Sequence, residues 1–310
     1  MPAIGASGIL GIAPEAISGT YVAPTKFIPF DSESLKWVQE NTERRPIRNT
    51  PSLVGMVRGN GHVEGEVSFD VTVDVLVWFL LVSRCTYTKT GTAPSFSYKF
   101  VPAPVAVPAK TLSITVKRGN DVAGYTGCVV SSFTLSVDSS GAFKASMNII
   151  GTAESTQAGA LTPTWPTALP FGAGMYSIQI PTATQVFDAD TYEFAVEDNA
   201  EAQNRLKNTI GAQFVKFGEN NTSVKVERDF ETRAELDQYK NLTSKSVTFE
   251  ATQGTEKVTI LTPVAFVNTY EYGLSSVGDL VRASVEYQCA INAAGNSFEL
   301  TVVTSESLPT

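Results

Sequence analysis

The clearest pattern of apolar and polar positions lies over residues 63–71. Val63, Val67 and Phe69 fall on one face of an extended chain, and the residues of the other face are charged or polar. A period of two with one charged face predicts a half-buried antiparallel strand. Residues 73–83 then change to a broad apolar surface with helical spacing, so we expect a short helix that packs on the strand.

The same pattern occurs twice in the chain. Val38–Glu43 recurs as Val196–Glu201, and the strand and helix of residues 63–78 recur at residues 224–239 in the same order. Any two β-rich segments share alternating apolar residues, so the agreements among polar residues carry the comparison. Colinear self-similarity of this kind indicates two copies of one module.

Further runs of alternating or β-branched residues predict the remaining strands. In the first copy these are residues 35–40, 97–101, 111–117, 127–137 and 142–150; in the second they are 192–196, 224–231, 246–251, 257–261, 264–272 and 282–291, with a helix at 233–242. The predicted class is mainly β, with each module a curved antiparallel sheet or sandwich and one packed short α-helix.

Segments rich in small residues and proline set the expected boundaries between modules. The predicted division is an N-terminal extended arm at 1–25, a first module at 26–152, a linker at 153–174, a second module at 175–303 and a C-terminal tail at 304–310. The arm is expected to be ordered only where it lies on another surface, and the tail is expected to be free.

Charge is distributed unevenly between the two copies. Through Phe171 the chain has 13 basic and 12 acidic residues, a net charge of +1, whereas from Gly172 onward it has 10 and 19, a net charge of −9. Nucleic-acid affinity comes mainly from Lys and Arg neutralising the phosphate backbone. An acidic chain is therefore a poor candidate for gripping DNA, although DNA could slide past it.

The cysteines and the N-terminus indicate the compartment. Cys85, Cys128 and Cys289 are few, widely spaced and odd in number, which suits thiols in a reducing cytoplasm better than a disulfide framework. No basic segment precedes Lys26, so no signal peptide is expected, and no apolar run is long enough to span a bilayer. We expect no membrane association.

Catalytic chemistry has little support in the sequence. The single histidine, His62, could form a metal site with Glu64 and Glu66, but alternation places both carboxylates on a solvent face, and a site needs three or four converging ligands. Cofactor and nucleophile motifs are absent. The expectation is that the protein is not an enzyme and has no catalytic residue, metal or cofactor.

The repeated order of strand, long loop, strand and short helix resembles that of the major tail tube proteins of long-tailed, non-contractile (siphovirus-type) bacteriophages. The resemblance covers most of the chain, although each motif alone is loose. The residues that carry it are Gly19–Thr25, Ile28–Leu35, Val63–Val67 with Phe69–Asp70, Leu112–Val116 and Gly127–Val130.

The resemblance implies a role for each group of residues. Neighbouring modules would join edge to edge into a large β-barrel tube, with rings stacked through the long loops and the N-terminal arm. The lumen-facing candidates are Glu64, Glu66, Ser68, Asp70, Lys225, Glu227, Asp229 and Glu231. The ring-stacking candidates are Arg44, Arg45, Arg48, Arg58, Glu201, Lys207 and Glu219. The helix–sheet core candidates are Val63, Val67, Phe69, Leu76, Phe79, Leu80, Val224, Val226, Phe230, Leu236 and Tyr239.

The interpretation that follows is a structural subunit of a phage tail tube, present in the virion tail after synthesis in the bacterial cytoplasm. Two modules per chain favour trimeric rings that act as pseudo-hexamers. Its partners would be copies of itself, the tape-measure, tail terminator and distal tail proteins, and passing DNA without specific binding. Two other interpretations stay open: a β-sandwich binding module or adhesin, and a hydrolase that uses paired carboxylates.

Overall fold

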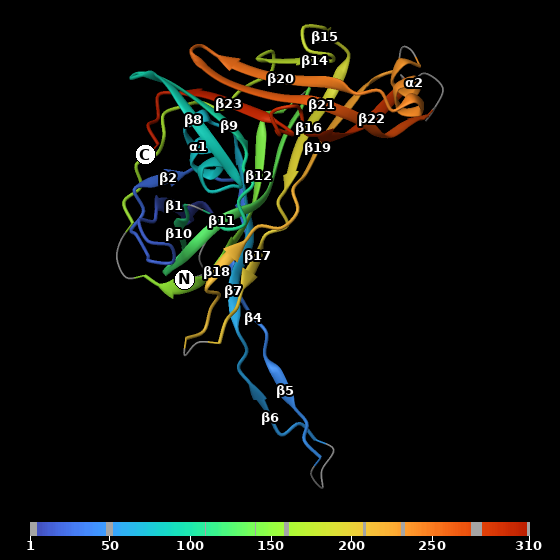
Figure 1. The fold of residues 1–310 in the computed structure, drawn as a ribbon. Helices are drawn as coiled ribbons and strands as arrows, with labels where there is room; N and C mark the ends of the chain where they lie inside the picture. Colours follow the sequence, from blue (N-terminus) through green and yellow to red (C-terminus); the bar gives the residue numbers. More distant parts are fainter. Residues whose placement is uncertain are drawn as a thin grey trace.

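The computed structural model describes residues 5–47, 52–108, 110–139, 141–157, 161–206, 209–230, 233–273 and 281–308 (Figure 1). As predicted, the fold is mainly β and its strand pairs are antiparallel. In the first half of the chain the strands are β1 (Ile9–Pro14), β2 (Lys26–Ile28), β3 (Ser32–Glu33), β4 (Lys36–Gln39), β5 (Thr42–Arg44), β6 (Gly55–Val57), β7 (Gly61–Asp70), β8 (Cys85–Thr92), β9 (Ser95–Pro102), β10 (Leu112–Arg118), β11 (Asp121–Asp138), β12 (Lys144–Gly151) and β13 (Ala153–Thr156).

The second half continues with the same kinds of element. Its strands are β14 (Tyr176–Gln179), β15 (Gln185–Val186), β16 (Ala189–Glu197), β17 (Glu201–Gln203), β18 (Phe214–Lys216), β19 (Asn221–Asp229), β20 (Lys245–Gln253), β21 (Glu256–Gly273), β22 (Arg282–Ala290) and β23 (Glu299–Thr304). Helix α1 (Val73–Leu81) lies in the first half and helix α2 (Ala234–Asn241) in the second, and a 3₁₀ turn, η1, covers Gly5–Ser7.

One sheet runs through both halves of the chain, and we call it the spanning sheet. Its strands follow the spatial order β3 and β4, β7, β12, β11, β16, β19, β22 and β21. The halves meet where β11 pairs with β16, from Ser132 opposite Glu197 to Asp138 opposite Thr191. The two halves therefore share one sheet and one main hydrophobic core.

Two strands of 18 residues each, β11 and β21, belong to more than one sheet. The first part of β11 pairs with β10 and β13, and its second part joins the spanning sheet. The first part of β21 pairs with β20 and β23, and its second part pairs with β22. Each strand has a register shift where it changes partners, after Val130 and after Val267, and such β-bulges bend a strand.

Strand pairings in the first half of the chain recur in the second half. The pair Trp37–Val63 between β4 and β7 has its counterpart in Val196–Thr222 between β16 and β19. The pairs of β10 with β11 recur between β20 and β21, including a register shift after the first pair. By this correspondence Val63 matches Thr222, two residues away from the Val224 that the sequence comparison aligned with it, because strand pairing fixes a register that apolar alternation cannot.

The predicted N-terminal arm is largely part of the fold. Strand β1 pairs with β10 on one side and β2 on the other, and its Leu10, Ile12 and Ala13 are buried. Glu15 holds the end of β1, since its carboxylate accepts hydrogen bonds from the Thr111 hydroxyl at 2.6 Å and from the Gly19 amide at 2.7 Å. Within the arm predicted at 1–25, Ile9–Pro14 is therefore an internal strand paired on both sides and not a separate segment.

The predicted linker and tail also contribute to the core. Strand β13 lies within the predicted linker and pairs with β11, and Phe171 is buried against Phe143, with ring centroids 6.1 Å apart. In the predicted free tail, Leu308 is buried and its amide donates to the Tyr98 hydroxyl at 3.0 Å. Glu306 pairs with Lys26 at 2.8 Å, so the tail through Leu308 is not free.

The predicted strands also differ from the structure at β21 and β8. The strands expected at residues 257–261 and 264–272 form one strand, β21, with Pro263 in its interior. Pro263 lies where the pairing with β20 shifts register, and a residue without an N–H is tolerated at such an irregularity. Strand β8 was not predicted, because its exposed residues carry little apolar alternation.

The two helices differ in burial although both were predicted. Helix α1 is apolar along nearly its whole length, and only Asp74 of its residues is not buried. Helix α2 packs against β21 and buries only Gln238. Figure 1 shows α1 inside the body and α2 at the edge of the upper sheet. Most residues of α2 are polar or charged, so its apolar face is too narrow to bury the helix, and it is a surface element.

Candidate functional site

One face of the spanning sheet is polar from strand to strand. The registers of neighbouring strands place Asp70, Lys144, Ser136, Glu193 and Lys225 in one row across β7, β12, β11, β16 and β19. The row continues through Glu286 to Thr269 at the edge of the sheet. This polar row crosses both halves of the chain. It forms because side chains alternate between the two faces of the sheet along every strand.

Carboxylates outnumber basic groups on this polar face. Four basic groups offset them in part: Lys36 lies 3.4 Å from Glu64, and Lys225 lies 3.0 Å from Glu227. The hydrogen bond that Lys225 donates to the Glu227 carboxylate raises the pKa of Lys225, so this ammonium stays charged at neutral pH. The acidic residues are Glu64, Glu66, Asp70, Glu193, Glu197, Glu227, Asp229, Glu271 and Glu286, and the basic residues are Lys36, Lys144, Lys225 and Arg282.

The lumen-facing candidates lie together on this face. Glu64, Glu66, Ser68 and Asp70 alternate with buried residues along β7, and Lys225, Glu227 and Asp229 occupy the same face of β19. Glu66 also accepts a hydrogen bond from the Ser146 hydroxyl at 2.7 Å. Glu231 lies outside the described residues.

Most core candidates are buried beneath the opposite face of the sheet. Those with buried side chains are Val63, Val67, Phe69, Leu76, Phe79, Leu80, Val224 and Val226. Phe230 is half-buried and stacks on Tyr272 with centroids 5.1 Å apart, and Leu236 is half-buried. Tyr239 is 44% exposed, so its assignment to the core is wrong.

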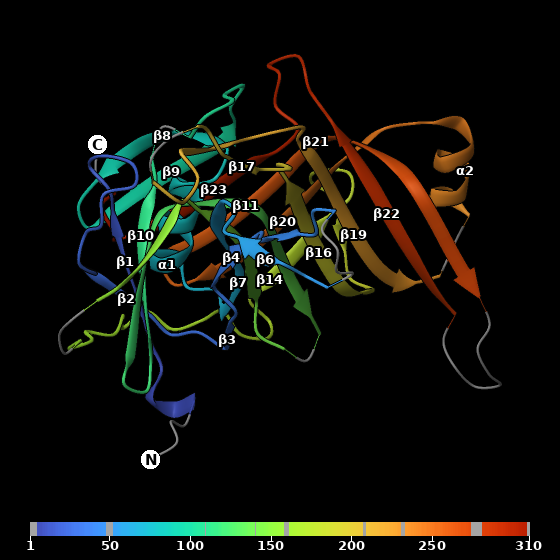
Figure 2. The same cartoon turned by 90° about the horizontal axis from the view of Figure 1, so that it is seen from below.

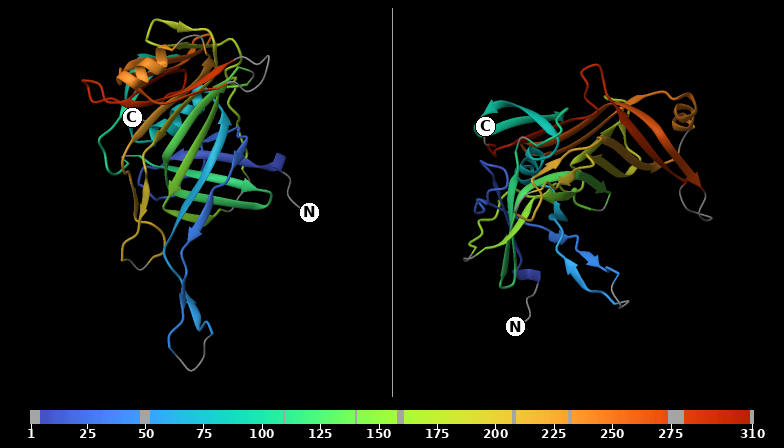
Figure 3. Two further views of the ribbon diagram at one scale, coloured as in Figure 1. Left: turned by 90° about the vertical axis from the view of Figure 1, so that its right-hand side faces the viewer. Right: turned by 60° about the horizontal axis from the view of Figure 1, so that its bottom comes forward.

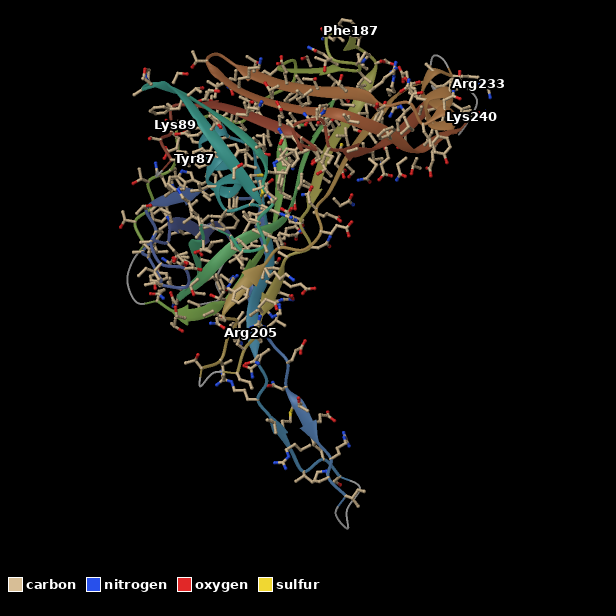
Figure 4. The ribbon with its side chains drawn as sticks, in the orientation of Figure 1. Tyr87, Lys89, Phe187, Arg205, Arg233 and Lys240 are labelled. Atoms are coloured by element: carbon tan, nitrogen blue, oxygen red, sulfur yellow. The ribbon has the colours of Figure 1, made fainter. Side chains whose placement is uncertain are left out.

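Two hairpins extend from one end of the spanning sheet. The β5–β6 hairpin connects β4 to β7, and the β17–β18 hairpin connects β16 to β19. The β5–β6 hairpin projects far from the body in both views of Figure 3, and its Ile47 and Met56 are exposed. The β17–β18 hairpin lies closer, because Val215 and Phe217 are buried in a second apolar cluster with Val129. Figure 4 shows Arg205 near this hairpin, far from Arg233, which precedes α2, and from Lys240 within it.

The ring-stacking candidates are carried by these hairpins. Arg44, Arg45 and Arg58 are exposed on the first hairpin or at its base, and Arg45 pairs with Glu43 at 2.9 Å. Glu201 and Glu219 are exposed on the second. Arg48 and Lys207 lie outside the described residues.

Glycines at the bases of the hairpins occupy matching positions. A Cβ at Gly59 would lie 1.5 Å from the carbonyl oxygen of Glu40, and a Cβ at Gly218 would lie 2.6 Å from that of Asn199. Both positions therefore need glycine for close backbone contact.

Among the described residues, no group of three or more His, Cys, Asp and Glu side chains could hold a metal ion. His62 approaches only Glu64, at 3.5 Å. Within the same residues neither helix is long and apolar enough to cross a membrane. Cys128 and Cys289 are buried free thiols, and burial raises the pKa of Cys289 to about 12.

Sequence reasoning expected joining at sheet edges but did not identify the strands that form the two open edges of the spanning sheet. In the described part of the chain, β4 pairs only with β7, and the part of β21 beyond Phe266 pairs only with β22. The repeat could have identified these edges, because β4 corresponds to β16 and β21 corresponds to β11. Both β16 and β11 are paired on two sides, whereas their counterparts are paired on one. A surface of this kind, with a polar face and two open strand edges, suits assembly with further β-strands.

No curated protein matches the chain. A family model described as phage tail tube protein matches residues 5–289, which is nearly the whole chain. The chain belongs to the phage tail tube protein family.

Proposed function

We propose that this chain polymerises with copies of itself into stacked rings that form the tail tube of a bacteriophage virion, and that the polar face of the spanning sheet lines the lumen. Family membership supports a structural subunit of the tail tube. The observation that carries the lumen assignment is the continuous polar row from Asp70 to Thr269, which ends beside an open strand edge.

We further propose that the chain is a tandem duplication of one tube module. The recurring strand pairs and the recurring bulges after Val130 and Val267 support this. Strand β1 matches β14, and strand β13 matches β23. Module bounds of about 9–157 and 176–304 therefore fit the matched strands better than the predicted 26–152 and 175–303. The β8–β9 hairpin is then an addition to the first module.

Two modules per chain favour three chains per ring. A ring of three would present six module-like sheets around the lumen, and closed rotational symmetry leaves no edge exposed. The junction of β11 and β16 within each chain already joins two such sheets. The ring would alternate between a nearly neutral first module and an acidic second module.

The proposed lumen has a charge suited to a DNA conduit during ejection. Its carboxylates repel the phosphate backbone, and this repulsion is screened over about 10 Å at moderate salt. Serine, threonine and asparagine side chains between them, such as Ser132 and Asn148, keep the wall polar without adding positive charge. DNA would therefore pass without specific binding.

Ring stacking is assigned to the two hairpins. The exposed apolar side chains and arginines of the β5–β6 hairpin have few contacts with the rest of their own chain, which suits a segment that binds the next ring. The predicted contribution of the N-terminal arm is now limited to residues outside β1, since β1 is an internal strand. The tape-measure, tail terminator and distal tail proteins remain the proposed partners, and a non-contractile tail is the proposed type.

Electron microscopy of the purified protein at high concentration tests this function. Tubes of uniform width with a central channel are the expected result. Monomers or irregular aggregates across a range of salt and protein concentrations, from a sample with a cooperative thermal transition, would contradict it.

A further inference from the structure

The two open edges of the spanning sheet come from different halves of the chain. One is β4 with β3, in the first half of the chain, and the other is the part of β21 beyond Phe266, in the second half. Figure 2 shows β21 and β22 on the side of the molecule that carries α2, with β3 and β4 well away from them. The two edges of one chain are therefore placed to meet two different neighbours.

The chain already contains a junction between the counterparts of these edges. Strand β11 matches β21 and strand β16 matches β4, and β11 pairs with β16 over seven residue pairs from Ser132–Glu197 to Asp138–Thr191. This matching rests on equivalent pairings: β11 pairs with β12 as β21 pairs with β22, and β4 pairs with β7 as β16 pairs with β19. The internal junction can therefore serve as a template for contact between chains.

We infer that β21 of one copy pairs antiparallel with β4 of the next copy in the register of the internal junction, so that Glu271 lies opposite Lys36. We call this contact the seam. The inference rests on the proposed function and adds to it the strands, the register and the charge pair that join neighbouring chains. Transfer of the register also places Thr269 opposite Val38 and Tyr270 opposite Trp37.

The side chains at the seam are complementary on both faces of the sheet. Glu271 and Lys36 lie on the polar face, and the Lys36 side chain is 65% exposed, so it can reach a new carboxylate. Tyr270 and Trp37 lie on the opposite face, where each is half-buried against the core. The seam would thus continue both the polar wall and the apolar layer beneath it.

The backbone groups also fit the transferred register. In the internal junction the Asp198 amide donates to the Ser131 carbonyl at 2.9 Å, and the counterparts of these residues are Gln39 and Asn268. Strand β4 bonds to β7 through its even-numbered residues, as the Glu40–Asn60 and Ser34–Glu66 bonds show. Trp37 and Gln39 therefore point their N–H and C=O groups away from β7, toward a neighbour.

One group at this edge already has partners. The Leu35 carbonyl accepts hydrogen bonds from Arg118 Nη2 at 2.6 Å and from the Tyr125 hydroxyl at 3.0 Å. The counterpart of Leu35 is Phe194, which pairs with Leu135. The free length of the β4 edge is thus Trp37–Gln39, and the seam depends mainly on the pairs at Val38, Trp37 and Lys36.

Cysteine cross-linking tests the register. Glu271 and Lys36 would form a pair without backbone hydrogen bonds, in which Cα atoms lie about 4.5 Å apart, within the roughly 4.4–6.8 Å that a disulfide spans, so a disulfide can form between chains. Oxidised tubes assembled from a mixture of E271C chains and K36C chains should give a covalent heterodimer on a non-reducing gel. Each variant alone, made with Cys85→Ser because Cys85 is only half-buried, should stay monomeric there, since Cys128 and Cys289 are buried.

Shifted pairs decide between registers. Tubes of E271C chains mixed with S34C chains or with V38C chains, each two residues away from Lys36, should cross-link at least about fivefold less than the E271C–K36C mixture. Stronger cross-linking by a shifted pair in well-formed tubes would overturn the seam and leave the proposed function standing. Absence of tubes in the parent protein would overturn both.

A charge swap tests the ion pair without cysteines. E271K should raise the concentration needed for assembly roughly fivefold, because it places two like charges opposite each other. The double variant E271K and K36E should restore assembly, whereas E271K with K144E should not, because Lys144 lies in the interior of the sheet opposite Asp70. Equal rescue by both double variants would contradict the seam.

Discussion

Arg118 binds Glu33 through two hydrogen bonds, from Nε to Oε1 at 2.7 Å and from Nη2 to Oε2 at 2.5 Å. This bidentate pair connects β10 to β3, and the carboxylate raises the pKa of the guanidinium above its ordinary value. The same Arg118 covers the Leu35 carbonyl at the open edge of the spanning sheet. The pair therefore holds together two sheets and protects one position of an exposed strand edge.

Arg118→Met should lower the free energy of unfolding by about 1–2 kcal/mol, since it leaves the Glu33 carboxylate, which is only 11% exposed, without its partner. Arg118 itself is 38% exposed, so solvent screening keeps the loss below that of a fully buried pair. Urea denaturation of the monomer measures the change. Lys99→Met, which removes the surface pair with Glu299, should cost about 0–1 kcal/mol, and an equal loss in both variants would contradict this account.

The two helices should respond unequally to truncation. Phe79→Ala removes a buried ring stacked on Phe69 with centroids 5.3 Å apart, and should cost about 3–5 kcal/mol of stability. Tyr239→Ala in α2 should change stability by no more than about 0.5 kcal/mol, because that ring is largely exposed. Thermal melts followed by circular dichroism compare the variants, and similar losses at both positions would show that α2 is part of the core.

The sequence predicted the elements whose two faces differ and missed those that depend on distant partners. The alternation in β7 and the apolar run of α1 are local signals, and both elements form where they were expected. Strand β1 depends on β10, about a hundred residues away in sequence, and its small apolar residues have no sustained period of their own. Tertiary pairing therefore decided its structure.

The candidate site shows the same division. Alternation alone put Glu64 and Glu66 on one polar face. Their alignment with Glu193 and Lys225 depends on β12, β11 and β16 lying between them, which requires the register of every strand. The repeated sequence pointed to corresponding strands, but a comparison based on apolar residues was two positions out of register for β19.

The arginines of the β5–β6 hairpin should control polymerisation. Changing Arg44, Arg45 and Arg48 together to Glu should leave the monomer folded, because Arg44 and Arg45 are exposed and lie on a hairpin that projects from the body. Assembly should fail, since the variant hairpin would repel the acidic surface of the next ring. Sedimentation measures assembly and circular dichroism measures folding; normal tubes from a folded triple variant would contradict the stacking role.

The charge of the polar face should control adhesion of DNA. Tubes that carry Glu66→Lys and Glu286→Lys should retain short DNA at low salt and release it at high salt. Lysines that bind DNA phosphates release the counterions of the DNA, and this gain becomes smaller as the salt concentration rises. Co-sedimentation of labelled DNA with tubes assembled in its presence measures retention.

The matched control is Asp237→Lys on the exposed side of α2, which places positive charge away from the polar face. This control should retain no more DNA than the parent tube. Equal retention by the α2 variant and the polar-face variant would show that the polar face does not line the channel.

In the proposed tube, each chain supplies two neighbouring modules, joined in one spanning sheet, to the wall. Electron cryomicroscopy of assembled tubes, averaged without imposed symmetry and viewed along the axis, tests this most directly. The account predicts three chains per ring, with six module-like sheets around the lumen and projecting β5–β6 hairpins at only three of them. A ring of six chains with twelve such sheets, or a lumen lined by the apolar side of the spanning sheet, would contradict it.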